Sequence, residues 1–324
     1  MRLMTKGVLG VSVASVSLVG MIASTFGEKS AIANLIPDQK EQTLLAQGKT
    51  NELVVIFPSR SDSTDLQNKA NAVAAFLSKQ LGVPVKAQIG DDTAAVEALR
   101  ANRADIAFLS SRPALKAEQL ANARLYLAEV RPTYSGKYTY NSVFVVPKNS
   151  PLKTQSTAKA TLTQLRGKRM AFTSPTSGSG FIFPTGELVK QGLVPNRDRL
   201  NDFFGQVTYG GNYSKAIQAV LRGQADVAAV SEYALNPPYI TEAEKNQLRI
   251  LHKIPGVPAH GVAIDDDVPV ATRNKIINAM LLLNQPQNNQ LLRNLYNSTE
   301  LVKIDHNRHL APLRNALQLA GIQP

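Results

Sequence analysis

The chain contains no cysteine and no tryptophan, and aromatic residues make up only 6% of it. Without cysteine it can form no disulfide, no thiolate metal site, no cysteine nucleophile and no lipid-modified N-terminal cysteine. The scarcity of aromatic rings disfavours a receptor that recognises sugars or bases by stacking. The four histidines lack the H-E-x-x-H spacing of a zinc site, although His306 and His309 can share a helical face, so we expect no metal and no cofactor.

Acidic residues are also in short supply, with 24 Asp and Glu against 36 Lys and Arg and a net charge of +12. An excess of positive charge can favour binding to nucleic acid, to an anionic membrane surface or to an anionic ligand. The basic residues are scattered, without a run of five or more and without a nucleic-acid motif, so we expect no nucleic-acid partner. A length of 324 residues predicts more than one lobe.

The N-terminus has the pattern of a signal peptide. Residues 7–23 are uncharged and mostly apolar, two basic residues precede them, and residues 31–33 (Ala-Ile-Ala) form a cleavage motif. Cleavage near Ala23 and a retained membrane anchor are the alternatives, but the apolar segment is short and weakly apolar for a span. We predict a cleaved signal peptide over 1–33, a polar lead-in over 34–50, and a periplasmic protein without a lipid anchor.

Strand-like and helix-like segments alternate along the rest of the chain, which predicts an α/β fold. Short apolar runs predict strands over 52–57, 83–89, 105–109, 142–146, 169–172, 206–209 and 226–230. Helical periodicity marks the segments 65–81, 93–101, 180–191 and 213–222, and the chain is mainly helical after residue 269. The alternation occurs in two blocks, so we predict one lobe from 51–140 with 255–324 and a second lobe from 141–254. Ligands of such sheets bind beyond the carboxyl ends of the strands, in this case between the lobes.

The segment from Thr173 to Pro184 joins a predicted strand to a predicted helix. It carries five hydroxyl side chains within seven residues, together with Gly178 and Gly180. The N–H groups that begin a helix and the hydroxyls beside them can hold an anion with several oxygens. A helix-capping loop is the structural alternative. The spacing around Ser179 fails the G-x-S-x-G pattern of serine hydrolases and no Walker A lysine follows, so we predict no catalytic residue and no enzyme.

Several features of this chain, this segment among them, resemble those of PhnD-like phosphate, phosphite and phosphonate binding proteins of ABC transporters. The run Ser-Pro-Thr-Ser-Gly-Ser-Gly, followed by three apolar residues and Pro184, is similar to that family's ligand loop. Tyr140 precedes the strand that enters the second lobe, and Glu232 falls where the family carries an acidic residue. Asn212 replaces a histidine, and Asp92 replaces a tyrosine.

The resemblance implies a two-lobed periplasmic-binding-protein clamp of the type II-like class. Each lobe is expected to hold a mixed, mainly parallel sheet flanked by helices, with hinge strands between the lobes. The implied partners are a small phosphorus oxyanion and an ABC transporter permease in the inner membrane, and the protein is expected to be a monomer. The implied ligand-binding residues are Thr176, Ser177, Gly178, Ser179, Tyr140, Asn212, Glu232 and Asp92.

Other interpretations remain open from the sequence. Asp92 and Asn212 can be helix caps, and Glu232 can be a solvated carboxylate. A sensor of the same fold that signals to a kinase, or a binder of another oxyanion such as sulfate, would share these features. An exported phosphoester hydrolase is a further alternative, but it would need a metal site or an activated nucleophile.

Overall fold

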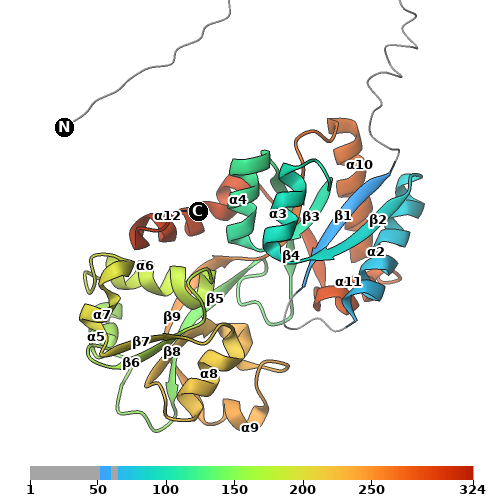
Figure 1. Cartoon of the computed structure of the whole chain (residues 1–324). Coiled ribbons are helices and arrows are strands. Elements are labelled where there is room, and N and C mark those ends of the chain that lie inside the picture. The colour runs from blue at the N-terminus through green and yellow to red at the C-terminus, as the bar shows by residue number, and fades with distance from the viewer. Residues whose placement is uncertain (1–51, 60–64, 324) are drawn as a thin grey trace, which may run out of the picture. The chain divides into compact units, whose positions relative to one another are not determined.

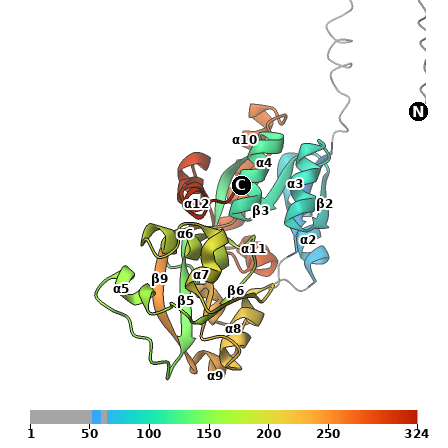
Figure 2. The same ribbon diagram turned by 60° about the vertical axis from the view of Figure 1, so that its left-hand side comes forward.

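The computed structural model describes residues 52–59 and 65–323 of the chain. The predicted signal peptide (1–33) and polar lead-in (34–50) lie outside the described residues. Two sheets, each flanked by helices, organise the described part (Figures 1 and 2). The predicted architecture of two α/β lobes is therefore confirmed.

The first lobe is built on the sheet β11-β4-β10-β3-β1-β2. Its elements are β1 (Leu53–Pro58), α2 (Leu66–Leu81), β2 (Val85–Gly90), α3 (Asp92–Arg100), β3 (Ile106–Leu109), α4 (Ser111–Ala121), β4 (Arg124–Val130), β10 (Gly261–Ile264), α10 (Val270–Leu281), η4 (Leu282–Asn284), α11 (Asn289–Tyr296) and β11 (Glu300–Lys303). β1 pairs in parallel with β2 and β3, whereas β10 and β11 run antiparallel to their neighbours.

Helices cover both faces of the first sheet, so its strands are apolar on both sides. In β1, Val55 and Phe57 point into a core shared with α2, α10 and α11, while Ile56 points into the core under α3 and α4. This alternation follows from the two-residue period of a strand. It explains why the segment reads as a continuous apolar run rather than as a polar and apolar alternation.

The second lobe is built on the sheet β7-β6-β8-β5-β9. Its elements are β5 (Thr139–Pro147), α5 (Ala158–Thr163), β6 (Arg169–Phe172), η1 (Gly178–Ile182), α6 (Phe183–Lys190), η2 (Arg197–Arg199), α7 (Leu200–Phe203), β7 (Gln206–Tyr209), α8 (Tyr213–Leu221), β8 (Val227–Ser231), η3 (Glu232–Leu235), α9 (Glu242–Lys245) and β9 (Leu248–Pro258). β6 runs parallel to β7 and β8, and β5 runs antiparallel to β8 and β9.

Three segments link the lobes. The chain enters the second lobe between β4 and β5 and returns between β9 and β10. The last helix, α12 (His306–Ala320), packs against α4 of the first lobe and against α6 and β9 of the second, as both ribbon views show (Figures 1 and 2). The paired strands β5 and β9 therefore lie at the connection, where the sequence places hinge strands.

Several elements were not predicted from the sequence. The strands β4 and β9 carry charged residues, which weakens their signal as buried strands. The helix α4 was missed although Pro113 in its first turn is typical of a helix start. The strand β11, with four residues, interrupts the region expected to be mainly helical. The helix predicted to begin at Gly180 instead begins with the π-helical turn η1, which leads directly into α6.

Candidate functional site

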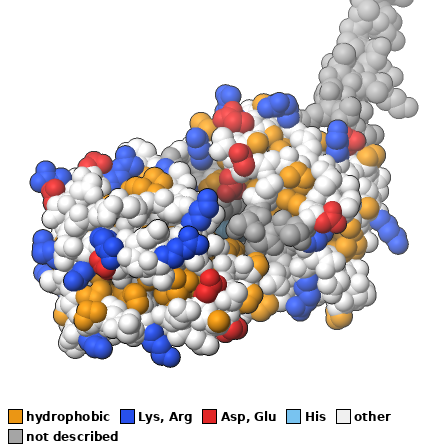
Figure 3. All heavy atoms as spheres, turned by 60° about the horizontal axis from the view of Figure 1, so that its bottom comes forward, with side chains coloured by type: hydrophobic (Ala, Val, Ile, Leu, Met, Phe, Trp, Pro, Cys, Tyr) orange, Lys and Arg blue, Asp and Glu red, His pale blue; other side chains and the backbone are white. Residues whose placement is uncertain are grey.

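A cavity of about 280 Å³ lies between the two lobes. The first lobe contributes the end of β3 and the start of α4, and the second lobe contributes the loop after β6 and the start of α8. The parallel strands β6 and β8 both end toward it, as expected for a ligand site of an α/β sheet. Figure 3 shows the recess between the two halves, with basic and acidic side chains around it.

The hydroxyl-rich loop forms the second-lobe wall of this cavity. Thr176, Ser177 and Gly178 line it, as do Thr173 and Ser174. Ser177 is the residue before η1, and its hydroxyl accepts a hydrogen bond from the N–H of Gly180 at 3.0 Å. Ser177 therefore both caps the helical turn and lines the cavity. The first turn of a helix with N–H groups not used within it is the arrangement that binds oxyanions.

Gly180 lets this loop close tightly on itself. The carbonyl of Gly180 accepts from the N–H of Thr173 at 3.1 Å. A Cβ atom at Gly180 would lie 2.1 Å from the Thr173 hydroxyl oxygen, which is well inside contact distance. The Thr173 hydroxyl itself donates to the carbonyl of Ala229 on β8. Glycine is therefore required here by the close approach of the chain.

Ser179 occupies a different environment from its neighbours in the loop. It is fully buried and is not among the residues that line the cavity. Its hydroxyl lies 2.8 Å from the phenol oxygen of Tyr213, and its carbonyl accepts from the hydroxyl of Ser142 at 2.6 Å. Direct ligand binding by Ser179 stays a prediction, since its hydroxyl reaches the cavity wall through Tyr213.

A cluster of tyrosines forms the floor between the lobes. Its members are Tyr134, Tyr140, Tyr213, Tyr233 and Tyr239, linked by ring contacts with centroid distances of 5.1 to 5.8 Å. Tyr140 and Tyr233 line the cavity, and burial, followed by the neighbouring tyrosines, raises the pKa of both phenols well above the ordinary value. Both phenols therefore remain protonated at neutral pH and are available as hydrogen-bond donors.

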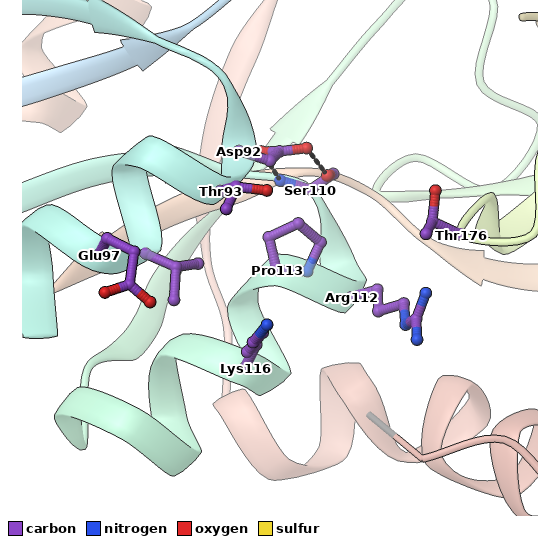
Figure 4. Close-up of a pocket in the computed structure, with 9 residues that line it drawn as sticks. Asp92, Thr93, Glu97, Ser110, Arg112, Pro113, Lys116 and Thr176 are labelled. Atoms are coloured by element: carbon purple, nitrogen blue, oxygen red, sulfur yellow. Dashed lines mark hydrogen bonds between the residues drawn. The ribbon is translucent and has the colours of Figure 1, made fainter. Parts of the chain in front are cut away.

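Asp92 lies on the first-lobe side of the cavity. It is the first residue of α3, whereas the cap of that helix is Asp91, whose carboxylate accepts from Ala94 N–H at 2.7 Å. Asp92 instead accepts from the hydroxyl of Ser110 and, at 3.4 Å, from the Ser110 N–H (Figure 4). The capping alternative for Asp92 is thus wrong, and its carboxylate holds the residue that precedes α4.

Asn212 and Glu232 are placed differently. Asn212 lines the cavity and also caps α8, since its side-chain oxygen accepts from Lys215 N–H at 2.9 Å. Its amide group keeps its two N–H donors for another partner. Glu232 is not among the lining residues, and its carboxylate forms an ion pair with Lys253 and accepts from the Asn141 side chain. The structure therefore groups the other predicted residues around the cavity without Glu232 and Ser179, whose ligand contacts stay predictions.

Asp92 was identified from the sequence, but none of the other first-lobe residues that line the cavity was. Ser110, Ser111 and Arg112 at the start of α4 line the cavity, together with Arg131 and His260. The signal was present as Ser-Ser-Arg-Pro, since serine before a helix and proline in its first turn mark a helix start. Arg131 is buried and pairs with Glu129 at 3.3 Å. No local pattern marks Arg131 or His260 as part of a site.

The two histidines of α12, His306 and His309, each form a hydrogen bond with a backbone group. Nδ1 of His306 accepts from Leu125 N–H at 2.9 Å, and Nε2 of His309 lies 3.0 Å from the carbonyl oxygen of Ala259. Within the described residues, no group of three His, Asp or Glu side chains is placed to hold a metal ion. In the same part of the chain, no helix combines the length and apolar character needed to cross a membrane.

Comparison with known proteins assigns the chain to a class. A family model described as "ABC transporter, phosphonate, periplasmic substrate-binding protein" matches residues 55–310. A phosphonates-binding periplasmic protein from Escherichia coli is 28% identical over 206 residues, which cover 62% of this chain and 56% of that protein. A phosphate-import protein PhnD from Mycolicibacterium smegmatis is 25% identical over 190 residues, or 57% of its length. The chain thus matches a little over half the length of these curated relatives.

Solved structures share the fold. A PhnD protein from Prochlorococcus marinus in complex with methylphosphonate superposes with a TM-score of 0.65 and 20% identity, covering 83% of this chain and 97% of that one. A Xanthomonas citri protein bound to ATP gives a TM-score of 0.68 at 18% identity, covering 85% of this chain and all of that one. At these identities the likeness concerns the fold alone, and it confirms the two-lobed clamp.

Proposed function

We propose that this chain, which belongs to the family of periplasmic substrate-binding proteins of phosphonate ABC transporters, captures a small phosphorus oxyanion in the cavity between its lobes. Phosphonate, phosphite and phosphate are the candidate ligands. The observation that carries the proposal is the hydroxyl-rich turn of Thr176, Ser177 and Gly178, which meets Tyr140 and Asn212 around one cavity. These groups supply hydrogen-bond donors from several directions, which suits a tetrahedral anion.

The role of the protein in this proposal is capture and delivery. Ligand contacts from both lobes favour closure about the linking segments 131–138 and 259–260, because only the closed arrangement satisfies both walls. The closed form is then recognised by an ABC transporter permease of the inner membrane. The protein makes and breaks no bond, acts as a monomer and resides in the periplasm after removal of its signal peptide.

Isothermal titration calorimetry of the purified protein tests the proposal. The ligand panel is phosphite, phosphate, methylphosphonate, 2-aminoethylphosphonate and sulfate, with ATP added because a structural neighbour binds it. We expect saturable binding of at least one phosphorus oxyanion and much weaker binding of sulfate. Equal binding of sulfate, or no binding of any phosphorus compound by the folded protein, would overturn the proposal.

A further inference from the structure

A second cavity, of about 310 Å³, opens beside the first on the first-lobe side, between α3 and α4. Asp92, Ser110, Arg112, Pro113 and Thr176 line both cavities, so the two are continuous. Only Thr176 comes from the second lobe, and it faces α4 across the space (Figure 4). A ligand whose phosphorus group lies against the hydroxyl-rich turn can therefore extend its substituent into this second cavity.

The carboxylates of the second cavity already have partners. Asp92 accepts from both the hydroxyl and the N–H of Ser110. Glu97 forms an ion pair with Arg100 at 2.8 Å. An incoming ammonium group would have to compete with these partners. Part of the acceptor capacity of Asp92 and Glu97 is therefore already used within the wall, and Glu97 is also paired with a cation.

The two cationic side chains of the second cavity, Arg112 and Lys116, have fewer partners than its carboxylates. Arg112 and Lys116 are four residues apart, so they project from the same face of α4 toward the cavity (Figure 4). Arg112 donates one hydrogen bond, to the carbonyl of Gln323 at 3.2 Å, from a group with five N–H donors. In the described part of the chain, Lys116 forms no ion pair or hydrogen bond.

Further positive charge reaches the same region. Burial lowers the pKa of Arg112, and the positive charge of Arg197 on the second lobe lowers it further. The start of α4 adds the partial positive charge of a helix N-terminus. A carboxylate bound between Arg112 and Lys116 would stabilise both cations. The guanidinium of Arg112 also matches the planar geometry of a carboxylate.

We propose that the cavity between α3 and α4 is a subsite for a carboxylate on the ligand's substituent, held by Arg112 and Lys116. This rests on the proposed function, and it narrows the ligand class to phosphonates that carry a second anionic group. A phosphonate with an aminoalkyl substituent is disfavoured, because its ammonium would lie against the two cations.

Calorimetry with three matched phosphonates tests the subsite. The probes are 3-phosphonopropionate, propylphosphonate, whose substituent has the same number of carbons but no charge, and 2-aminoethylphosphonate. We expect 3-phosphonopropionate to bind roughly tenfold more tightly than propylphosphonate at low salt, with the preference shrinking as ionic strength rises. Tighter or equal binding of 2-aminoethylphosphonate would overturn the subsite.

Lys116→Gln is the diagnostic variant, since Lys116 lines only the second cavity. It should reduce the preference for 3-phosphonopropionate about threefold and leave the affinity for propylphosphonate unchanged. Lys275→Gln removes the same charge from the exposed surface of α10 and should change neither affinity. An unchanged preference in Lys116→Gln would refute the subsite alone, whereas failure of all three probes and of methylphosphonate to bind would refute the proposed function as well.

Discussion

The hydroxyl of Ser179 and the phenol of Tyr213 form a hydrogen bond of 2.8 Å that links the turn before α6 to the start of α8. Ser179 is buried, whereas Tyr213 lines the cavity between the lobes. The serine therefore acts as a support that fixes a wall residue of the site.

This relationship predicts coupling between the two side chains. Ser179→Ala and Tyr213→Phe should each lower the free energy of unfolding by about 0.5–1.5 kcal/mol, the usual contribution of a hydrogen bond. The double variant should cost less than the sum, because both changes remove the same bond. Urea unfolding of the four proteins measures this, and strictly additive costs would show that the bond contributes nothing.

Tyr140 is predicted to donate a hydrogen bond to the ligand. Its phenol is buried in the cavity wall and its raised pKa keeps it protonated. Tyr140→Phe should weaken ligand binding by about 0.5–3 kcal/mol, the larger value applying to a bond with a charged acceptor. The control is Tyr138→Phe, which changes an exposed phenol two residues away that does not line the cavity. Calorimetry that finds equal affinities for both variants would exclude the role of Tyr140.

Replacing each glycine of the loop by alanine should affect the free energy of unfolding differently. Gly180→Ala places a methyl group against Thr173 and should lower the free energy of unfolding by roughly 1–3 kcal/mol. At Gly178 the nearest atom to a new Cβ is the Ser111 hydroxyl at 4.0 Å, so Gly178→Ala should change stability by less than about 0.5 kcal/mol.

Gly178→Ala should nevertheless weaken ligand binding, because Gly178 lines the cavity and the methyl group takes ligand space. Thermal or urea unfolding and calorimetry on the same samples separate the two effects. The interpretation of the loop fails if Gly180→Ala is as stable as the parent or if Gly178→Ala binds ligand normally.

His309 on α12 makes stability depend on pH. Burial is the main cause that lowers the pKa of its imidazole, with the charge of His306 adding to the effect and the hydrogen bond to Ala259 opposing it. Protonation is therefore harder in the folded state than in the unfolded state, where the pKa is about 6.5. The free energy of unfolding should fall as the pH drops below that value.

The variant His309→Gln isolates this effect, since glutamine can still donate to the Ala259 carbonyl but does not titrate. Urea unfolding at pH 7.5 and 5.5 should show a smaller loss of stability for the variant than for the parent. His252 and His306, whose pKa values are also lowered by burial, account for part of the remaining dependence. An identical loss in both proteins would show that His309 does not contribute.

The local features of the site could be predicted because they lie close together in the chain. The strand Arg169–Phe172, the hydroxyl-rich segment after it and the helix that follows are contiguous, so composition and periodicity suffice to find them. Asn212 became a candidate through the resemblance to the PhnD-like family, and the structure places it as the cap of α8. The exception within the loop is Ser179, whose hydroxyl bonds to Tyr213, 34 residues away.

The remaining features depend on contacts between distant segments. The tyrosine cluster joins residues from before β5, from β5, from the start of α8 and from the region after β8, which meet only because β5 and β8 are neighbours in the sheet. The sequence shows nine tyrosines and few aromatics overall, without any sign of this gathering. In the same way, the partners of Asp92 and Glu232 come from other elements.

The two α/β lobes and the hydroxyl-rich turn could be predicted from the amino-acid sequence, because strand and helix periodicity and the residue types of a helix start are local properties. Which side chains share the cavity and which carboxylates are already paired depends on the tertiary structure. Those outcomes depend on sheet order and on the packing of α4 and α12 between the lobes, which bring together residues more than two hundred positions apart, as in the contact of Arg112 with Gln323.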